Sequence, residues 1–236
     1  LVLYINTDML SENNLPVPDF NWTIEDLLKY SQKITNEKNF GIGGDKGVYW
    51  VTPYLSYYGG GVLSDEFKVI IDSDNSQKAI KFYKDLKYKY KVMPKESDVG
   101  SSTLAQMFEN RQIGMYLSGR WMFPTLSQNC KFNWIVVNFP IGISPQTCDV
   151  SGWGISKTSK HKESAIKFVK YISNAENSKY FAQTGLIIPA NRDAVKIIKN
   201  NHNEKVFLDI IKYTDNTYVD KNYKKLTDEI NKKYNL

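Results

Sequence analysis

Residues 101–123 read SSTLAQMFENRQIGMYLSGRWMF and join a helical pattern directly to a strand pattern. The first half, SSTLAQMFENRQ, is typical of a capped amphipathic helix. The residues IGMYL that follow form a short apolar run, which Ser118 and Gly119 end. The stretch therefore predicts a helix and a strand in sequence, with an arginine and a tryptophan, Arg120 and Trp121, at the end of the strand.

Strands and helices alternate on both sides of this unit. Beyond about Ser156 the chain is nearly all helical in pattern. This alternation predicts an α/β layered fold with a set of helices at its C-terminal end. The segments that carry the prediction are LVLYIN, KVII and NWIVVNFP as strands, GIGGDKG as a mobile turn, and IEDLLKYSQKI, VYWVTPYLSYY, AIKFYKDLKYKY, KESAIKFVKYIS, ENSKYFAQTG, RDAVKIIKN and EKVFLDIIKY as helices.

Composition narrows the class of protein. The 236 residues are 42% hydrophobic and 24% charged, without a long apolar run, which is typical of a globular chain and not of a membrane-spanning or disordered one. The net charge of +6 comes from lysines that are spread among asparagines and tyrosines. Without an arginine-rich block, no nucleic-acid partner is predicted.

Motifs for metal binding and nucleophilic catalysis are missing from the sequence. Cys130 and Cys148 form no CxxC pair, and a disulfide between them and two free thiols both remain open. His161 and His202 lie in segments rich in lysine and asparagine, with no HExxH or GxSxG framework nearby. We therefore expect no metal, no cofactor and no enzymatic activity.

One enzymatic alternative stays open at this point. Four carboxylates, those of Asp65, Glu66, Asp98 and Glu109, could meet in space as a pair for glycoside hydrolysis. The separation of the two groups would decide, and the sequence does not contain it.

Aromatic residues are the unusual feature, at 14% of the chain. Several of them lie at the predicted ends of elements, where clefts form in α/β folds. Such rings either stack on sugar-like ligands or fill the core, and both interpretations are open. Trp153 stands between Gly152 and Gly154, which lets a ligand approach the backbone. The others are Tyr49, Trp50, Tyr57 and Trp121.

Six motifs in order resemble one protein family. They are LVLYINTDML, FNWTIEDLLKYSQKI, YLSYYGGGV, the opening stretch through Trp121, SGWGISKTSKHKESAIKFVKYIS and QTGLIIPANRDA. Together they are similar to the sugar-binding family 1 of extracellular solute-binding proteins of bacterial ABC importers, the maltose-binding-protein-like group. The match departs from the family pattern at Thr7, where a lysine is usual, and at Trp22, which precedes Thr23 instead of following it.

The resemblance implies a periplasmic-binding-protein-like fold of type II, with two α/β lobes, of which this chain is a truncated form. Residues 1–138 would be the main part of the second, C-terminal lobe. Residues 139–190 would hold the hinge crossing and the remainder of the first lobe, and residues 191–236 would be C-terminal helices that return to the second lobe. An isolated piece of this kind is expected to expose apolar surface and to form a non-native dimer.

The resemblance also implies a function. Such a protein captures an extracellular sugar or oligosaccharide by hinge closure and delivers it to the transmembrane subunits of a permease. It would work at the outer face of the cytoplasmic membrane, with a lipid anchor on the full-length protein. A non-sugar solute remains an alternative. The predicted ligand-binding residues are Trp121 as stacking platform, Arg120 as donor, Trp153 and Gly152 from the opposite wall, and Tyr49, Trp50 and Tyr57.

Overall fold

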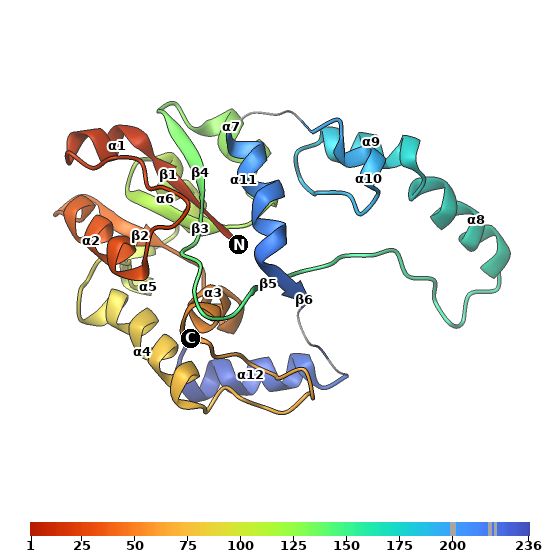
Figure 1. Ribbon diagram of the computed structural model, residues 1–236, viewed down its shortest axis with the longest axis horizontal. Coiled ribbons are helices and arrows are strands. Elements are labelled where there is room, and N and C mark those ends of the chain that lie inside the picture. The colour runs from red at the N-terminus through yellow and green to blue at the C-terminus, as the bar shows by residue number, and fades with distance from the viewer. Residues whose placement is uncertain (199–201, 217–218, 220) are drawn as a thin grey trace.

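The computed structural model describes residues 1–198, 202–216, 219 and 221–236. Its centre is a four-stranded sheet in the order β2-β3-β1-β4 (Figure 1). β1 (Val2–Asn6) lies between β3 (Ile113–Ser118) and β4 (Trp134–Asn138) and is antiparallel to both. β2 (Phe40–Gly43) pairs with β3 in parallel. The predicted strands LVLYIN, IGMYL and NWIVVNFP are thus neighbours in one sheet.

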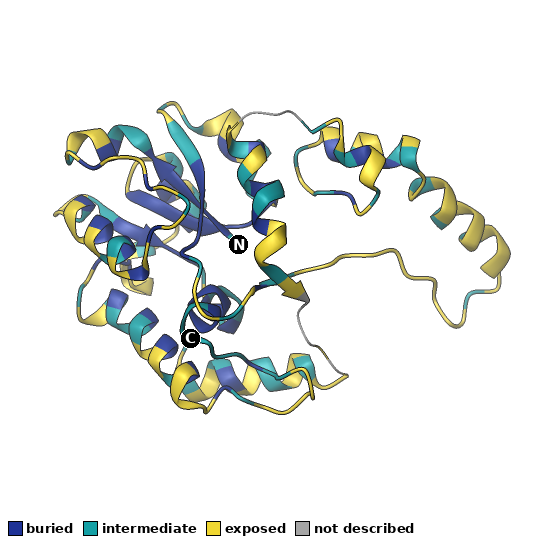
Figure 2. Cartoon of the chain, in the orientation of Figure 1, coloured by how far each residue is buried: buried dark blue, intermediate teal, exposed yellow. Residues whose placement is uncertain are grey.

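Two cores cover the two faces of this sheet. Successive side chains of a strand point to opposite faces, so Leu3 and Ile5 enter the first core while Val2 and Tyr4 enter the second. The first core is closed by α1 (Thr7–Glu12), α2 (Ile24–Ile34), α3 (Val48–Tyr58) and α4 (Asp74–Tyr88). The second is closed by α6 (Leu104–Glu109), α7 (Phe123–Asn129) and α11 (His202–Ile210). The sheet is buried between these helices (Figure 2), and the predicted α/β layered fold is confirmed.

Local signals explain where several of these helices begin and end. The Thr23 side chain accepts from the Asp26 amide while the Asp26 carboxylate accepts from the Thr23 amide, which is a capping box at the start of α2. Thr103 and Gln106 form the same motif before α6. α3 ends at Gly59, whose φ of 75° is left-handed and favours glycine.

Two predictions about local structure were wrong. GIGGDKG is not a mobile turn, because its first residues belong to β2. A side chain at Gly41 would place its Cβ 2.0 Å from the carbonyl oxygen of Ser31, so glycine is what lets α2 pack closely on this strand. KVII forms no strand in the described structure and contributes a single bridge between Leu63 and Val69.

Beyond β4 the chain leaves the layers. β5 (Gln146–Cys148) pairs in parallel with β6 (Thr214–Asn216). Between them, α8 (Lys162–Ile172), α9 (Ala175–Gln183) and α10 (Arg192–Val195) extend away from the sheet, and we call these three helices the projecting unit (Figure 1). α8 has no buried residue (Figure 2). The chain then returns through α11, a short 3-10 turn (Ile211–Tyr213), and α12 (Tyr223–Tyr234), which packs on α3.

The open question about the cysteines is answered, because Cys130 and Cys148 are both free thiols. Burial raises the pKa of Cys130 to about 12, so its thiol is unreactive at neutral pH. No helix in the described part of the chain is both long and apolar enough to cross a membrane.

Candidate functional site

Gly119, the glycine in SGRW, is required by the position of the Trp121 ring. After β3 the chain turns through the 3-10 helix η1 (Arg120–Met122), and the Trp121 indole folds back over Gly119. A Cβ on Gly119 would lie 1.9 Å from the Trp121 Cζ3 atom, which no side chain tolerates. Trp121 remains 43% exposed although it follows a buried strand. A large and partly exposed ring is therefore held at the end of β3.

Three rings from two elements form a continuous group, which we call the aromatic cluster: Tyr49, Trp50 and Trp121. The centroids of Trp50 and Trp121 are 6.3 Å apart at 71°, and those of Tyr49 and Trp50 are 5.3 Å apart at 85°. These edge-to-face contacts are the favourable geometry for aromatic pairs. Trp50 also packs against the first core, which holds the cluster in place.

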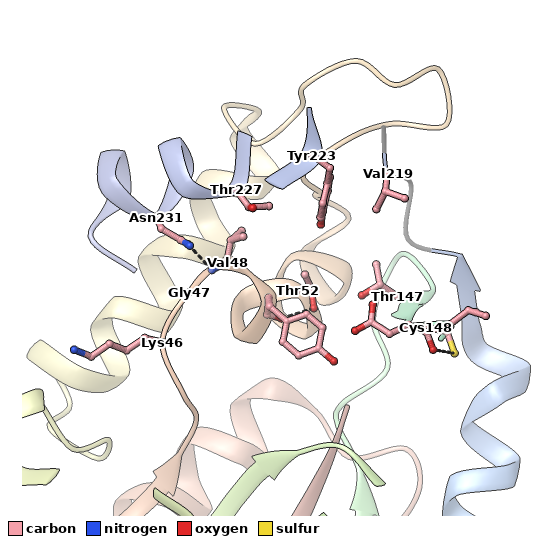
Figure 3. Close-up of a pocket in the computed structure, with 13 residues that line it drawn as sticks. Lys46, Gly47, Val48, Thr52, Thr147, Cys148, Val219, Tyr223, Thr227 and Asn231 are labelled. Carbon is pink, nitrogen blue, oxygen red and sulfur yellow. Dashed lines mark hydrogen bonds between the residues drawn. The ribbon is translucent and has the colours of Figure 1, made fainter. Parts of the chain in front are cut away.

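Tyr49 connects the aromatic cluster to a cavity of about 620 Å³ between the start of α3, β5 and α12 (Figure 3). A second cavity of about 290 Å³ shares Thr52, Thr147 and Tyr223 with it and lies along α3 toward the glycines that end this helix. The larger cavity combines hydroxyl, amide and charged groups with rings. Its polar lining residues are Lys46, Tyr49, Thr52, Thr147, Asp149, Tyr223, Thr227 and Asn231.

The wall of this cavity is built by a contact between distant segments. Gly47 provides no side-chain cap for α3. Instead the Val48 amide donates to the Asn231 Oδ1 atom of α12 at 2.6 Å, and the Thr52 hydroxyl donates to the Tyr49 carbonyl at 2.7 Å (Figure 3). An unpaired amide at a helix start is thereby satisfied from another helix.

The phenols of this region stay neutral at physiological pH. Burial raises the pKa of Tyr49 well above its ordinary value, and the nearby negative charge of Asp149 adds to the effect. Burial, and to a lesser extent the negative charge of Asp149, also raises the pKa of Tyr223. A neutral phenol both donates and accepts hydrogen bonds, as a sugar hydroxyl requires of its partner.

Arg120 does not belong to the aromatic cluster, although it precedes Trp121 in the sequence. It is buried, and its Nη2 atom donates to both oxygens of the Glu204 carboxylate at 3.0 and 2.8 Å. Its Nη1 atom donates to the Ile187 carbonyl at 2.5 Å. These partners belong to the protein, so the arginine that we predicted as a ligand donor has its terminal nitrogens engaged inside the fold.

The remaining predicted residues lie apart from the aromatic cluster. The Tyr57 hydroxyl donates to Glu25 Oε2 at 3.4 Å at the far end of α3. Trp153 is 61% exposed, and its ring lies 6.5 Å from that of Phe181 in α9. A Cβ on Gly152 would meet no atom within 4 Å. The structure therefore unites Tyr49, Trp50 and Trp121, and it does not bring Tyr57, Trp153 or Gly152 to them.

Three of the four carboxylates of the enzymatic alternative have local partners in the described structure. Asp98 Oδ2 accepts from the Lys95 amide at 2.8 Å, and Glu109 Oε1 accepts from Asn129 at 3.1 Å. Glu66 pairs with Lys68 at 2.5 Å, while Asp65 lines the smaller cavity. Within the described residues, no group of three or more histidine, cysteine or acidic side chains could hold a metal ion.

Comparison with known proteins identifies the family of the chain. A family model described as bacterial extracellular solute-binding protein matches residues 1–206. The maltodextrin-binding protein MdxE of Bacillus subtilis is 25% identical over 228 residues, a match to 86% of this chain and 51% of that protein. The chain thus spans about half the length of this curated relative.

Solved structures share the fold at low identity. An ABC substrate-binding protein from Listeria monocytogenes in complex with cycloalternan has a TM-score of 0.86 at 22% identity, over 99% of this chain and 62% of that one. UgpB from Mycobacterium tuberculosis in complex with glycerophosphocholine has a TM-score of 0.79 at 14% identity, over 92% of this chain and 57% of that one. These two structures thus share the fold while they hold different compounds, cycloalternan in one and glycerophosphocholine in the other.

Proposed function

The chain belongs to the family of bacterial extracellular solute-binding proteins, and from this premise we propose that it carries one wall of a carbohydrate-binding site in an ABC importer. The site consists of the aromatic cluster and the adjoining 620 Å³ cavity. It serves a receptor that captures a sugar or oligosaccharide outside the cell.

The observation that carries this proposal is the exposed Trp121 indole, which contacts Trp50 and through it Tyr49, a lining residue of a cavity with many hydrogen-bonding groups. A sugar ring has an apolar face, formed by its C–H groups, and a polar rim of hydroxyls. The 43% exposed indole suits the apolar face. The neutral phenols of Tyr49 and Tyr223, with Thr52 and Asn231, suit the hydroxyls.

The volume favours more than one sugar unit. The larger cavity alone falls within the range of about 300–1,000 Å³ that small-molecule sites occupy, and the smaller cavity extends the lined surface along α3. An oligosaccharide would place one ring on Trp121 and further units along the hydroxyls of the cavity.

Binding by hinge closure requires a second wall. We assign residues 1–138 to one lobe, together with α11 and α12, which pack on that lobe's β4 and α3. The projecting unit then belongs to the other lobe. α10 goes with it because α10 packs on α9, so the return to the first-named lobe begins at α11 instead of at residue 191. A ligand that touches both lobes favours the closed form.

The same proposal places the protein at the outer face of the cytoplasmic membrane, held there by a lipid anchor on the full-length form, where it hands its ligand to the transmembrane subunits of a permease. It also assigns no turnover to the site. The relatives above are binding proteins.

A binding screen tests the proposal. The protein, in the longest form that its gene encodes, is titrated with glucose, maltose, maltotriose and cycloalternan, and with glycerophosphocholine as a non-sugar solute. Binding to the native state raises the melting temperature, and calorimetry gives the Kd. We expect saturable binding of at least one saccharide without release of a hydrolysis product. Binding of glycerophosphocholine alone would contradict the sugar assignment, and product release would contradict the receptor.

A further inference from the structure

Two consecutive residues at the end of β3, Arg120 and Trp121, make contacts on opposite faces of the sheet. Trp121 contacts Trp50, which packs against the first core. The Arg120 guanidinium lies 5.7 Å from the centroid of Phe207, which belongs to the second core. The backbone of η1 is therefore held from both sides. A displacement of the η1 backbone would therefore change the positions of both side chains.

Arg120 joins three segments that are distant in the sequence. Its ion pair with Glu204 reaches α11, and its bond to the Ile187 carbonyl reaches the segment between α9 and α10. The Arg120 and Glu204 side chains are only 6% and 9% exposed. We call this group of three residues the Arg120 anchor. A charge buried to this extent is stable only while its partners stay in place.

The anchor lies where the projecting unit meets the sheet layers. The contact is made by residues 185–188, which we call the 185–188 turn. A Cβ on Gly185 would lie 3.3 Å from the Pro124 side chain in α7, and Ile188 packs against the second core. The Ile187 carbonyl that Arg120 binds lies between these two contacts in the chain. Movement of the projecting unit therefore strains the anchor directly.

The anchor is not fully satisfied in this arrangement. Arg120 Nε is buried and has no hydrogen-bond partner in the described part of the chain. A buried donor without an acceptor costs free energy. The Nε donor of Arg120 is therefore available to an acceptor in a second arrangement of the 185–188 turn.

We propose that Arg120 is a positioning residue, whose buried bonds to Glu204 and the Ile187 carbonyl couple the docking of the projecting unit to the pose of Trp121. The inference rests on the proposed function, since it supposes that a sugar stacks on Trp121. A sugar that restrains Trp121 restrains η1, and this keeps the anchor intact and the 185–188 turn docked. By reciprocity, a docked turn raises the affinity for the sugar.

Hydrogen–deuterium exchange of the 185–188 turn tests the coupling. The protein, in its longest encoded form, is measured with and without each of the four saccharides of the binding screen. We expect the bound sugar to slow exchange of these amides in the unmodified protein. Sugar binding that leaves their exchange unchanged would overturn the coupling and leave the proposed function standing. A protein that binds none of the saccharides would overturn both.

A double variant separates positioning from mere stability. Arg120→Met alone removes the bidentate ion pair from the buried Glu204 carboxylate, so this single variant is expected to lose stability. Arg120→Met with Glu204→Leu replaces the pair by apolar side chains, an exchange that buried pairs often tolerate. We expect this double variant to fold, to lose the sugar-dependent protection of the 185–188 turn and to bind the sugar on the order of tenfold more weakly.

The control is Arg111→Met, which removes the exposed ion pair with Glu12 and should change neither readout. A stable double variant that keeps the affinity and the sugar-dependent protection of the unmodified protein would overturn the proposal.

Discussion

Two neighbouring residues at the end of β3 have different environments. The Trp121 ring is partly exposed to solvent, and Arg120 is buried in a network with Glu204 and Ile187. The sequence predicts that both stand at a strand end, because the apolar run stops at Ser118 and Gly119. It does not predict the direction of either side chain. That direction depends on α11, whose Glu204 lies 84 residues away in the sequence.

The first prediction concerns the stacking platform. Trp121→Ala should raise the Kd for the bound saccharide by about thirtyfold or more, or about 2 kcal/mol, as loss of a stacked anchor does. Calorimetry on the longest encoded form measures it. The control is Tyr88→Ala on α4, which removes a ring of similar exposure (46%) far from the aromatic cluster in the sequence and should leave the Kd unchanged. An unchanged Kd for Trp121→Ala would remove this residue from the site.

The second prediction concerns Gly119. Its replacement by alanine would force the Trp121 indole off the backbone, because the new Cβ would lie 1.9 Å from the ring. We expect Gly119→Ala to lower the free energy of unfolding by about 1–3 kcal/mol, as overpacking does, and to weaken sugar binding. Urea denaturation and calorimetry measure the two effects. Gly44→Ala is the matched control, because a Cβ there would meet only the Leu117 side chain, at an ordinary contact distance of 3.6 Å. Equal behaviour of the two variants would refute this account of the SGRW stretch.

At the scale of elements, short apolar runs were enough to predict β1, β3 and β4, and helical periodicity was enough to predict α2 and α3. β2 was missed because its glycines, Gly41 and Gly43, carry no strand signal of their own. They are there because a side chain at either position would collide with Ser31 or Ile113. Tertiary packing, and not local preference, decides such a segment.

The lining of the cavity could also be predicted only in part from the sequence. Tyr49 could be predicted from its place at the start of a helix, but Tyr223 and Asn231 come from α12, which reads as a polar terminal helix. Nothing in its local pattern indicates that Asn231 caps α3. Contacts between segments separated by 183 residues follow only from the folded arrangement.

The third prediction tests this contact. Asn231→Ala should lower the free energy of unfolding by about 1 kcal/mol, because the Val48 amide at the start of α3 loses its acceptor. Asn231→Asp keeps an acceptor oxygen and adds a negative charge at a helix N-terminus, so it should retain most of the stability. Urea denaturation of the three proteins measures the difference. Equal losses for alanine and aspartate would show that the hydrogen bond contributes nothing.

At the scale of the whole molecule, the projecting unit exposes many apolar side chains. Phe168, Tyr171 and Tyr180 are 59%, 63% and 64% exposed, and Trp153, in the segment that leads into the unit, is 61% exposed. Soluble proteins rarely leave so many large apolar residues uncovered on one segment. In the two-lobe arrangement that we propose, the remainder of the other lobe would cover them.

The fourth prediction follows for the 236-residue chain by itself. We expect it to associate as its concentration rises, in a non-native dimer or larger species, because the face of α8 is unpartnered. Size-exclusion chromatography with light scattering measures the mass. Phe168→Ser with Tyr171→Ser should shift the chain toward monomer, whereas Tyr88→Ser on α4 should not. A monomer at all concentrations would contradict the prediction.

The proposed function requires that a sugar stacks on Trp121 near the cavity that Tyr49 lines, and a crystal structure of the complex would show whether it does. The longest encoded form would be crystallised with the saccharide that binds most tightly. We predict that the apolar face of one sugar ring lies within about 4 Å of the Trp121 indole, the distance of direct contact, and that further hydroxyls bond groups of the cavity. A saccharide bound elsewhere, with the Trp121 ring left open, would contradict the claim.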